Sequence, residues 1–226
     1  MIYFNNVTKR YNKSEASLED INFSVSRGEF VSIIGHSGAG KTTLTKLLLA
    51  EEKPTEGTVF FESTDIHKLS SRGLTKFRRK IGAIFQDFRL LRDKTVYENI
   101  AFAMEATGRE DAEIMQDVPH ILELVDLTNK AFHYPNQLSG GEKQRLSIAR
   151  AIINQPEIIL ADEPTGNLDP LNSTEVINIL KKINELGTTV ILATHDKNIV
   201  NQLKKRVITI KNGHIIRDDR EGKYMI

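Results

Sequence analysis

The sequence contains no cysteine, no marked excess of charge of either sign and no long apolar run. Without cysteine the chain has no disulfide framework, no thiolate zinc site and no cysteine nucleophile. Lys and Arg number 31 against 30 Asp and Glu, a balance that disfavours binding to nucleic acid by bulk electrostatics. We therefore expect no nucleic-acid partner. The apolar runs are strand-length and fall far short of the ~20 residues of a membrane-spanning helix.

The amino-terminal segment Met1–Asn6 has no basic stretch followed by an apolar one, so we expect no secretory signal. We expect a protein of the cytoplasm whose contact with a membrane is indirect and runs through a partner. With 226 residues, 39% of them hydrophobic and 27% charged, the chain is long enough for one good core and a small second subdomain.

Three short apolar runs, Phe30–Ile34, Ile158–Ala161 and Thr189–Ala193, are typical of parallel strands that are covered on both faces. The residues that follow them include Gly35, Asp162 and His195, so chemistry is expected at the carboxyl ends of the strands. These runs predict an α/β core.

The rest of the chain divides into β-rich ends and a helical middle. Alternating apolar residues near the amino terminus predict strands, and Asn212-Gly213 near the carboxyl terminus is the dipeptide best suited to a tight hairpin turn. From about Val96 to Ile153 the apolar residues recur at three- and four-residue spacing, which indicates helices. The pattern predicts an inserted helical subdomain.

The segment Gly35–Thr42 fits G-x-x-x-x-G-K-[ST] at every fixed position. Glycines let the backbone wrap a phosphate, and the following helix offers its positive N-terminal end. We predict that Lys41 reaches the β- and γ-phosphates and that Thr42 ligates Mg²⁺. The loop alone is compatible with ATPases, kinases and GTPases. The residues predicted to contact the nucleotide here are Gly35, His36, Ser37, Gly38, Ala39, Gly40, Lys41, Thr42 and Thr43.

Two carboxylates, Asp162 and Glu163, follow the apolar run Ile158–Ala161. Taken alone, they fit an acidic turn after a buried strand as well as they fit a catalytic pair. Beside a phosphate loop the catalytic interpretation is favoured. Asp162 would then hold Mg²⁺ through water, and Glu163 would polarise the attacking water as general base.

The string Leu138-Ser139-Gly140-Gly141-Glu142 has the spacing of a helix capping box, between Ser139 and Glu142. Two glycines weaken the first turn of a helix, and a helix N-terminus attracts anions. The string resembles the signature of ATP-binding cassette (ABC) ATPases. Other positions match that family in order: Tyr11 where it stacks an aromatic ring on adenine, Gln86 of its Q-loop, Asp169 of its D-loop Gly166–Asp169, and the switch histidine His195.

The resemblance implies an α/β fold: a P-loop NTPase core of ABC type with an antiparallel β-subdomain and an inserted α-helical subdomain. The core would span residues 1–86 and 156–226, and residues from about 87 to 155 would carry the signature. It implies ATP and Mg²⁺ as cofactors, with Glu163 and His195 catalytic. It also implies a homodimer in the ATP state, in which one chain's signature closes over the other's γ-phosphate. The implied metal ligands are Thr42, Gln86 and, through water, Asp162; the signature residues are Ser139, Gly140, Gly141 and Glu142.

The segments Phe85–Leu91 and Thr95–Asn99 resemble the cell-division branch of the family more closely. That branch implies an integral membrane partner resembling FtsX and control of cell-wall hydrolysis during division. Lipoprotein- and macrolide-export ATPases share part of this pattern, so the motor of such an exporter is the alternative. Soluble ABC proteins of translation or DNA repair carry two cassettes or long coiled-coil insertions, and neither is visible in this sequence. The function of a metabolite kinase would not account for the signature string.

Three apolar residues lie in what should be a surface loop: Phe88, Leu90 and Leu91. They form a groove for a partner's helix or pack against the helical subdomain, and the sequence leaves both open. The histidines outside the motifs are expected at the surface: His67, His120, His133 and His214.

Overall fold

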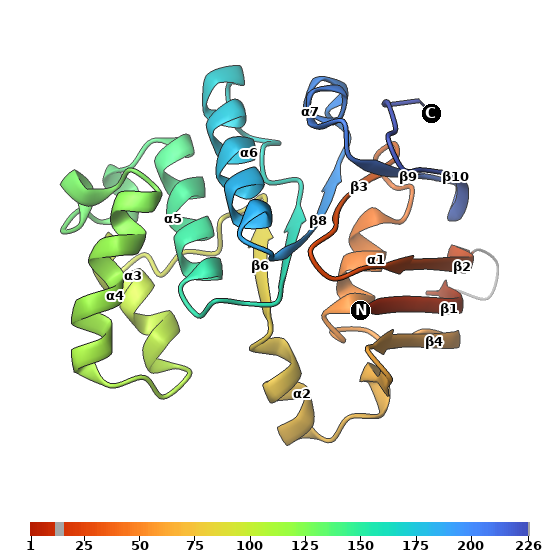
Figure 1. The fold of residues 1–226 in the computed structure, drawn as a ribbon, viewed down its shortest axis with the longest axis horizontal. Coiled ribbons are helices and arrows are strands. Elements are labelled where there is room, and N and C mark those ends of the chain that lie inside the picture. The colour runs from red at the N-terminus through yellow and green to blue at the C-terminus, as the bar shows by residue number, and fades with distance from the viewer. Residues whose placement is uncertain (12–15, 226) are drawn as a thin grey trace.

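A mostly parallel sheet with strand order β10-β9-β3-β8-β7-β6 forms the centre of the molecule in this computed structural model, which describes residues 1–11 and 16–225 (Figure 1). All side chains of β3, β7 and β8 are buried, which explains why their sequences are mostly apolar. The three predicted strands are confirmed, and β7 and β8 each run one residue further than predicted. The strands are β3 (Phe30–Ile34), β6 (Ile81–Phe85), β7 (Ile158–Asp162), β8 (Thr189–Thr194), β9 (Arg206–Lys211) and β10 (His214–Asp219).

An antiparallel sheet of strand order β2-β1-β4-β5 covers one side of this centre. Helix α1 (Lys41–Leu48) is buried at the interface of the two sheets, and its leucines share one core cluster with side chains of both. In that cluster Phe4 and Phe23 stack with their ring centroids 4.7 Å apart. The predicted antiparallel β-subdomain is therefore present. Its strands are β1 (Ile2–Arg10), β2 (Ala16–Val25), β4 (Glu56–Phe61) and β5 (Thr64–Asp65).

The hairpin between β9 and β10 turns at Asn212-Gly213, as predicted. Both residues have positive φ, 48° and 77°, which is the conformation that a tight two-residue turn requires at both central positions. Lys211 and His214 are paired across the turn. The dipeptide thus fixes the register of this edge hairpin.

Helices α6 (Pro170–Glu185) and α7 (Lys197–Leu203) cover the other face of the parallel sheet, as Figure 1 shows. Their apolar side chains form a second core cluster with β7 and β8, which includes Leu180, Ile199 and Leu192. Helix α2 (Ser71–Arg78) links the antiparallel sheet to β6. Because helices and the second sheet close both faces, the carboxyl ends of the parallel strands form the open edge.

Beyond β6 the chain forms a helical subdomain with its own core, seen on the left of Figure 1. It contains α3 (Val96–Glu105), α4 (Asp111–Leu124) and α5 (Gly140–Ile152), with short 3-10 turns at Thr128–Lys130 and Pro135–Gln137. The predicted inserted helices are therefore confirmed. The core they enclose includes Ile100, Met104, Val118, Leu122 and Leu146.

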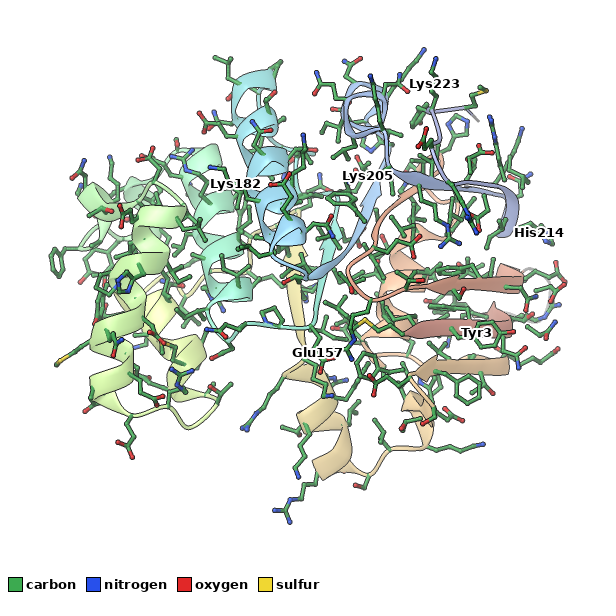
Figure 2. All side chains as sticks on the ribbon, viewed as in Figure 1. Tyr3, Glu157, Lys182, Lys205, His214 and Lys223 are labelled. Carbon is green, nitrogen blue, oxygen red and sulfur yellow. The ribbon has the colours of Figure 1, made fainter. Side chains whose placement is uncertain are left out.

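Glu157, labelled in Figure 2, joins segments that are far apart in the sequence. It precedes β7, and its carboxylate lies 2.8 Å from Lys80 Nζ and 3.1 Å from Arg27 Nη2. Glu157 also accepts the main-chain hydrogen bond of Thr189. This acidic residue thus fixes the amino-terminal ends of β6, β7 and β8 relative to the turn before β3.

The expectation of surface positions is wrong for His67 and His133, which are both half-buried, whereas His120 and His214 are exposed as expected. A 3-10 turn at Ile66–Lys68 leaves His67 half-buried, and neither ring nitrogen has a hydrogen-bond partner within the described residues. Burial lowers the pKa of His67, because the charged ring loses its hydration. In the part of the chain that the structure describes, no helix is both long and apolar enough to cross a membrane.

Candidate active site

The loop between β3 and α1 has the shape that its glycines permit. Gly40 has a φ of 110°, and a Cβ there would lie 2.5 Å from Leu18 Cδ2. At Gly35 a Cβ would lie 2.4 Å from the carbonyl oxygen of Ile210. Glycine is needed at both positions because the loop passes against the backbone and side chains of neighbouring strands. Helix α1 therefore begins directly at the loop, with its N-terminus toward the open edge.

A cleft of about 560 Å³ lies in front of this loop. An adjoining cleft of about 330 Å³ shares Thr42, Gln86 and Glu163 with it and adds Asp162 and Asn167. The structure therefore brings together predicted site residues from four separate segments of the chain. The first cleft is lined by Ser17, Ser37, Gly38, Gly40, Lys41, Thr42, Thr43, Gln86, Glu163 and His195.

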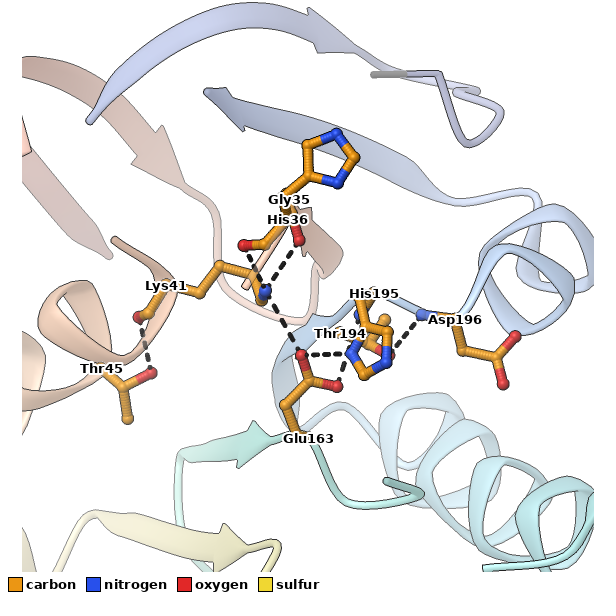
Figure 3. Close-up of polar contacts among 8 residues, drawn as sticks. All are labelled: Gly35, His36, Lys41, Thr45, Glu163, Thr194, His195 and Asp196. Atoms are coloured by element: carbon orange, nitrogen blue, oxygen red, sulfur yellow. Dashed lines mark hydrogen bonds and ion pairs between the residues drawn. The ribbon is translucent and has the colours of Figure 1, made fainter. Parts of the chain in front are cut away.

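Glu163 is the centre of a polar network in the cleft (Figure 3). Its Oε1 lies 3.3 Å from Lys41 Nζ and 2.9 Å from His195 Nδ1. Lys41 Nζ also donates to the carbonyl oxygens of Gly35 at 2.8 Å and His36 at 3.3 Å. A φ of 49° at Glu163 turns the chain at the end of β7 and carries the carboxylate over the loop. A fixed carboxylate of this kind suits a general base.

Asp162 is the buried carboxylate of the pair, with 8% of its surface exposed. Burial raises its pKa, and the neighbouring Glu163 charge adds to this, whereas a hydrogen bond with the Thr42 side chain opposes it. Asp162 Oδ1 has no hydrogen-bond partner among the described residues. A divalent cation would satisfy this oxygen and favour the charged carboxylate, and oxygen donors are the ligands that Mg²⁺ prefers. The donors present therefore fit Mg²⁺.

The same donors are too few to hold a metal by themselves. Within residues 1–11 and 16–225 no cluster of three or more His, Cys, Asp or Glu has the arrangement of a metal site. Mg²⁺ commonly binds through one or two protein ligands together with substrate phosphates and water. The arrangement thus suits a metal that arrives with a nucleotide.

Ser139 begins α5 with the predicted capping box. The main-chain N of Glu142 donates to Ser139 Oγ at 3.3 Å, and the main-chain N of Ser139 donates to Glu142 Oε2 at 2.7 Å. The hydrogen bond from the main-chain N of Ser139 lowers the pKa of Glu142, because it stabilises the charged carboxylate. The residues from Ser139 to Glu142 do not line the clefts around Lys41 and Asp162. One chain therefore does not bring its own signature to its own phosphate loop.

The two signature glycines have different surroundings. A Cβ at Gly141 would lie 1.8 Å from Asn172 Oδ1, whereas a Cβ at Gly140 would meet nothing closer than Leu168 Cδ2 at 3.5 Å. The close approach of α5 to α6 therefore requires a glycine at position 141. Packing gives no such reason for Gly140.

We expect Gly141→Ala to lower the free energy of unfolding by about 1–3 kcal/mol, the usual cost of overpacking. Asn172 cannot rotate away freely, because its Nδ2 donates to Asp169 Oδ2. Gly140→Ala is the matched control and should leave the free energy of unfolding unchanged or slightly higher. Urea unfolding followed by circular dichroism measures both, and equal effects would contradict the packing argument.

Tyr11 lies at the margin of the site and does not line the cleft. Its ring is 53% exposed, and Lys9 Nζ lies 5.0 Å from the ring centroid. Burial raises the pKa of its hydroxyl, and a hydrogen bond to Glu52 adds to this. The exposed ring is available for stacking, although the residues that follow, 12–15, lie outside the described part of the chain.

Asp169 caps α6, a role that the motif alone did not indicate. Its Oδ1 accepts from the main-chain N of Leu171 at 3.0 Å and of Asn172 at 3.1 Å, and hydrogen bonds from Asn172 lower its pKa. Sequence reasoning also missed Asn167, which contacts Gln86. The only signal for it was its place inside the D-loop.

The fold and the site define an ATPase of the ABC class. The family model described as ABC transporter matches residues 18–166, and the chain belongs to this family. It is 49% identical to the cell division ATP-binding protein FtsE of Mycobacterium tuberculosis, over 99% of this chain and 98% of that protein. Identity to FtsE of Escherichia coli K12 is 43%, over 95% of this chain and 97% of that protein. The predicted ABC class and its cell-division branch are confirmed.

Solved structures agree with the fold. The ATP-binding cassette MJ0796, in a dimeric post-hydrolysis state bound to ADP and Pi, has a TM-score of 0.89 and 38% identity, with 99% of this chain and all of that chain covered. CbiO1 of Clostridium perfringens, part of the ABC transporter complex cbiONQ, has the same TM-score at 30% identity, over 97% of this chain and 88% of that chain. The predicted fold class, a P-loop core with antiparallel and helical subdomains, is confirmed.

Proposed function

We propose that this chain is the ATP-binding and ATP-hydrolysing subunit of an FtsE–FtsX-like complex. ATP-driven closure of its homodimer acts on an integral membrane partner that regulates cell-wall hydrolysis during cell division. The observation that carries the proposal is the polar network of Lys41, Glu163 and His195 beside the phosphate loop. Similarity to cell-division FtsE proteins along nearly the whole chain supports the cellular role.

Each cleft residue has a role that follows from its position. Lys41 places its charge on the β- and γ-phosphates, and the loop amides bind the phosphate oxygens. Thr42, Gln86 and, through water, Asp162 would hold Mg²⁺, which neutralises charge on the phosphates when bound. Glu163 accepts the proton of the attacking water, and His195 orients Glu163 through the 2.9 Å contact.

The dimer follows from the position of the signature. Ser139, Gly140 and Gly141 form the N-terminus of α5, which would bind the γ-phosphate, yet they lie outside their own chain's cleft. A second copy related by a two-fold axis would supply the missing group to each cleft. The dimeric structures of MJ0796 support this arrangement.

Phe88 and Leu91 are the residues through which we place the membrane partner. Phe88 lines a groove of about 300 Å³ between β6 and α5, and both residues are half-buried. Leu90 packs against the core of the helical subdomain, so it serves the fold. The charged residues that line the groove are all arginines: Arg78, Arg79, Arg89 and Arg150. This favours a partner helix with an apolar face and a carboxylate. Membrane contact would then be indirect, on the cytoplasmic face.

Co-purification from membranes tests the proposal. The unsubstituted chain should bring down an integral membrane protein resembling FtsX. A Phe88→Ser and Leu91→Ser double variant should lose this protein by at least about tenfold, because an interface loses its apolar anchors. Its circular dichroism spectrum and nucleotide binding should remain. Phe132→Ser, which changes a side chain that is 83% exposed on the helical subdomain, is the control and should retain the partner.

Three results would contradict the proposal. A lipoprotein- or macrolide-exporter protein as the membrane partner would establish the alternative function. A double variant that retains the FtsX-like partner would remove the groove from the interface, and one that unfolds would place both residues in the core.

A further inference from the structure

Gln86 and Asn167 exchange two hydrogen bonds, although 81 residues separate them in the chain. Gln86 Nε2 donates to Asn167 Oδ1 at 3.2 Å, and Asn167 Nδ2 donates to the main-chain oxygen of Gln86 at 3.2 Å. The pair joins the segment after β6 to the loop before α6. Both residues line the cleft that also contains Thr42 and Asp162.

Gly166 provides the space for this contact. A Cβ at Gly166 would lie 2.8 Å from Gln86 Nε2 and 3.0 Å from its Cδ. The φ of Gly166 is outside the left-handed region, so the backbone there does not itself require glycine. Glycine is needed because the Gln86 amide lies directly against this loop. Two adjacent residues, Gly166 and Asn167, therefore fix one side-chain amide.

Which end of the amide is held decides what the other end can do. An amide nitrogen only donates hydrogen bonds, whereas the amide oxygen accepts them and ligates hard cations. Asn167 holds the nitrogen of Gln86, and the hydrogen bonds of the described residues include none to Gln86 Oε1. Asp162 Oδ1, in the same cleft, is also without a partner among those residues. Two oxygen donors of one cleft are thus available together.

We propose that Asn167 is a positioning residue that presents Gln86 Oε1 to the divalent cation of the bound nucleotide. The inference rests on the proposed function, in which Gln86 is a metal ligand. Residues that orient a metal ligand through a hydrogen bond commonly affect metal affinity. Asn167 also belongs to the loop that leads into the capped N-terminus of α6. Metal binding in the cleft is thereby connected to the position of this loop.

Metal affinity tests the role of Asn167 separately from hydrolysis. In the full chain carrying Glu163→Gln, Mn²⁺ binding is measured by electron paramagnetic resonance at saturating ATP. Asn167→Ala should raise the half-saturating Mn²⁺ concentration about 3- to 10-fold, the range for losing a modest hydrogen bond that orients a ligand. ATP affinity measured in EDTA should not change. Gly166→Ala should shift Mn²⁺ binding in the same direction, because its methyl group displaces the amide.

A double variant shows whether Asn167 acts through Gln86. Gln86→Ala together with Asn167→Ala should bind Mn²⁺ no more weakly than Gln86→Ala alone. Asn178→Ala, which changes an exposed asparagine on α6, is the control and should bind Mn²⁺ like the parent chain.

Several outcomes would overturn the role of Asn167. They are unchanged Mn²⁺ affinity in Asn167→Ala, an equal loss of ATP affinity in EDTA, or losses that multiply in the double variant. A parent chain that binds neither ATP nor Mn²⁺ with ATP would instead overturn the proposed function.

Discussion

A Glu163→Gln variant is expected to lose ATP hydrolysis by about 10²- to 10⁴-fold, the range that a general base contributes. Glutamine keeps the size of the side chain and accepts hydrogen bonds, but it takes up no proton at neutral pH. The variant should still bind ATP, because Lys41 is released from the ion pair that it forms with Glu163 at 3.3 Å. Its positive charge then faces the phosphates without competition.

Phosphate release and the binding of a fluorescent ATP analogue are the two measurements. Glu185→Gln is the control, because Glu185 lies at the end of α6, far from the network. This variant should hydrolyse ATP like the unsubstituted chain. Rapid hydrolysis by Glu163→Gln would remove Glu163 from its role. Loss of ATP binding in the same variant would show that the carboxylate holds the phosphate loop in shape rather than acting as base.

The local sequence was sufficient to predict the structure wherever one short segment determines it. Phe30–Ile34 is recognisable as a buried parallel strand because both of its faces are covered, so all of its residues except Ser32 are apolar. The turn at Asn212-Gly213 follows from two residues that tolerate positive φ. The capping box of Ser139 and Glu142 closes within one helical turn. These features depend on neighbours in the sequence.

What the sequence left open depends on contacts between distant segments. The spacing of Gly140 and Gly141 is the same whichever of them packs against α6, and the structure assigns the close approach to Gly141. Apolar character alone does not separate Leu90, which packs in the helical core, from its neighbours. His67 became half-buried because the 3-10 turn before α2 folds inward, and no periodic pattern marks that turn.

The polar network was predictable in its members but not in its connections. Each of Lys41, Glu163 and His195 has a motif position, and parallel strands bring their carboxyl ends to one edge. The contact of Lys41 with Glu163 arises because Glu163 adopts a φ of 49°, which a glutamate seldom does. The contact of Asn167 with Gln86 was not predicted at all. Its hydrogen bonds join two loops, and nothing in the sequence indicates that these loops lie together.

A Glu163→Gln chain is expected to accumulate as an ATP-dependent dimer with twice the mass of one chain. ATP that is bound but not hydrolysed would hold each α5 N-terminus against the partner's γ-phosphate. Adding Ser139→Arg should abolish this dimer, because a bulky cation would stand in the closed interface where the amides of α5 meet the nucleotide. Each single chain should still bind ATP, since Ser139 lies outside its own cleft.

Loss of the helix cap must be separated from the effect on the interface, because removing an N-cap alone costs about 0.5–2 kcal/mol of stability. Thr95→Arg is the matched control: Thr95 caps α3 with the same box, through Glu98, and lies on a different helix. It should lose a similar amount of stability and still dimerise with ATP. Size-exclusion chromatography with light scattering at saturating Mg-ATP measures whether each variant is a monomer or a dimer. Dimerisation of the Ser139→Arg chain, or a Glu163→Gln chain that stays monomeric at high concentration, would contradict the two-fold arrangement.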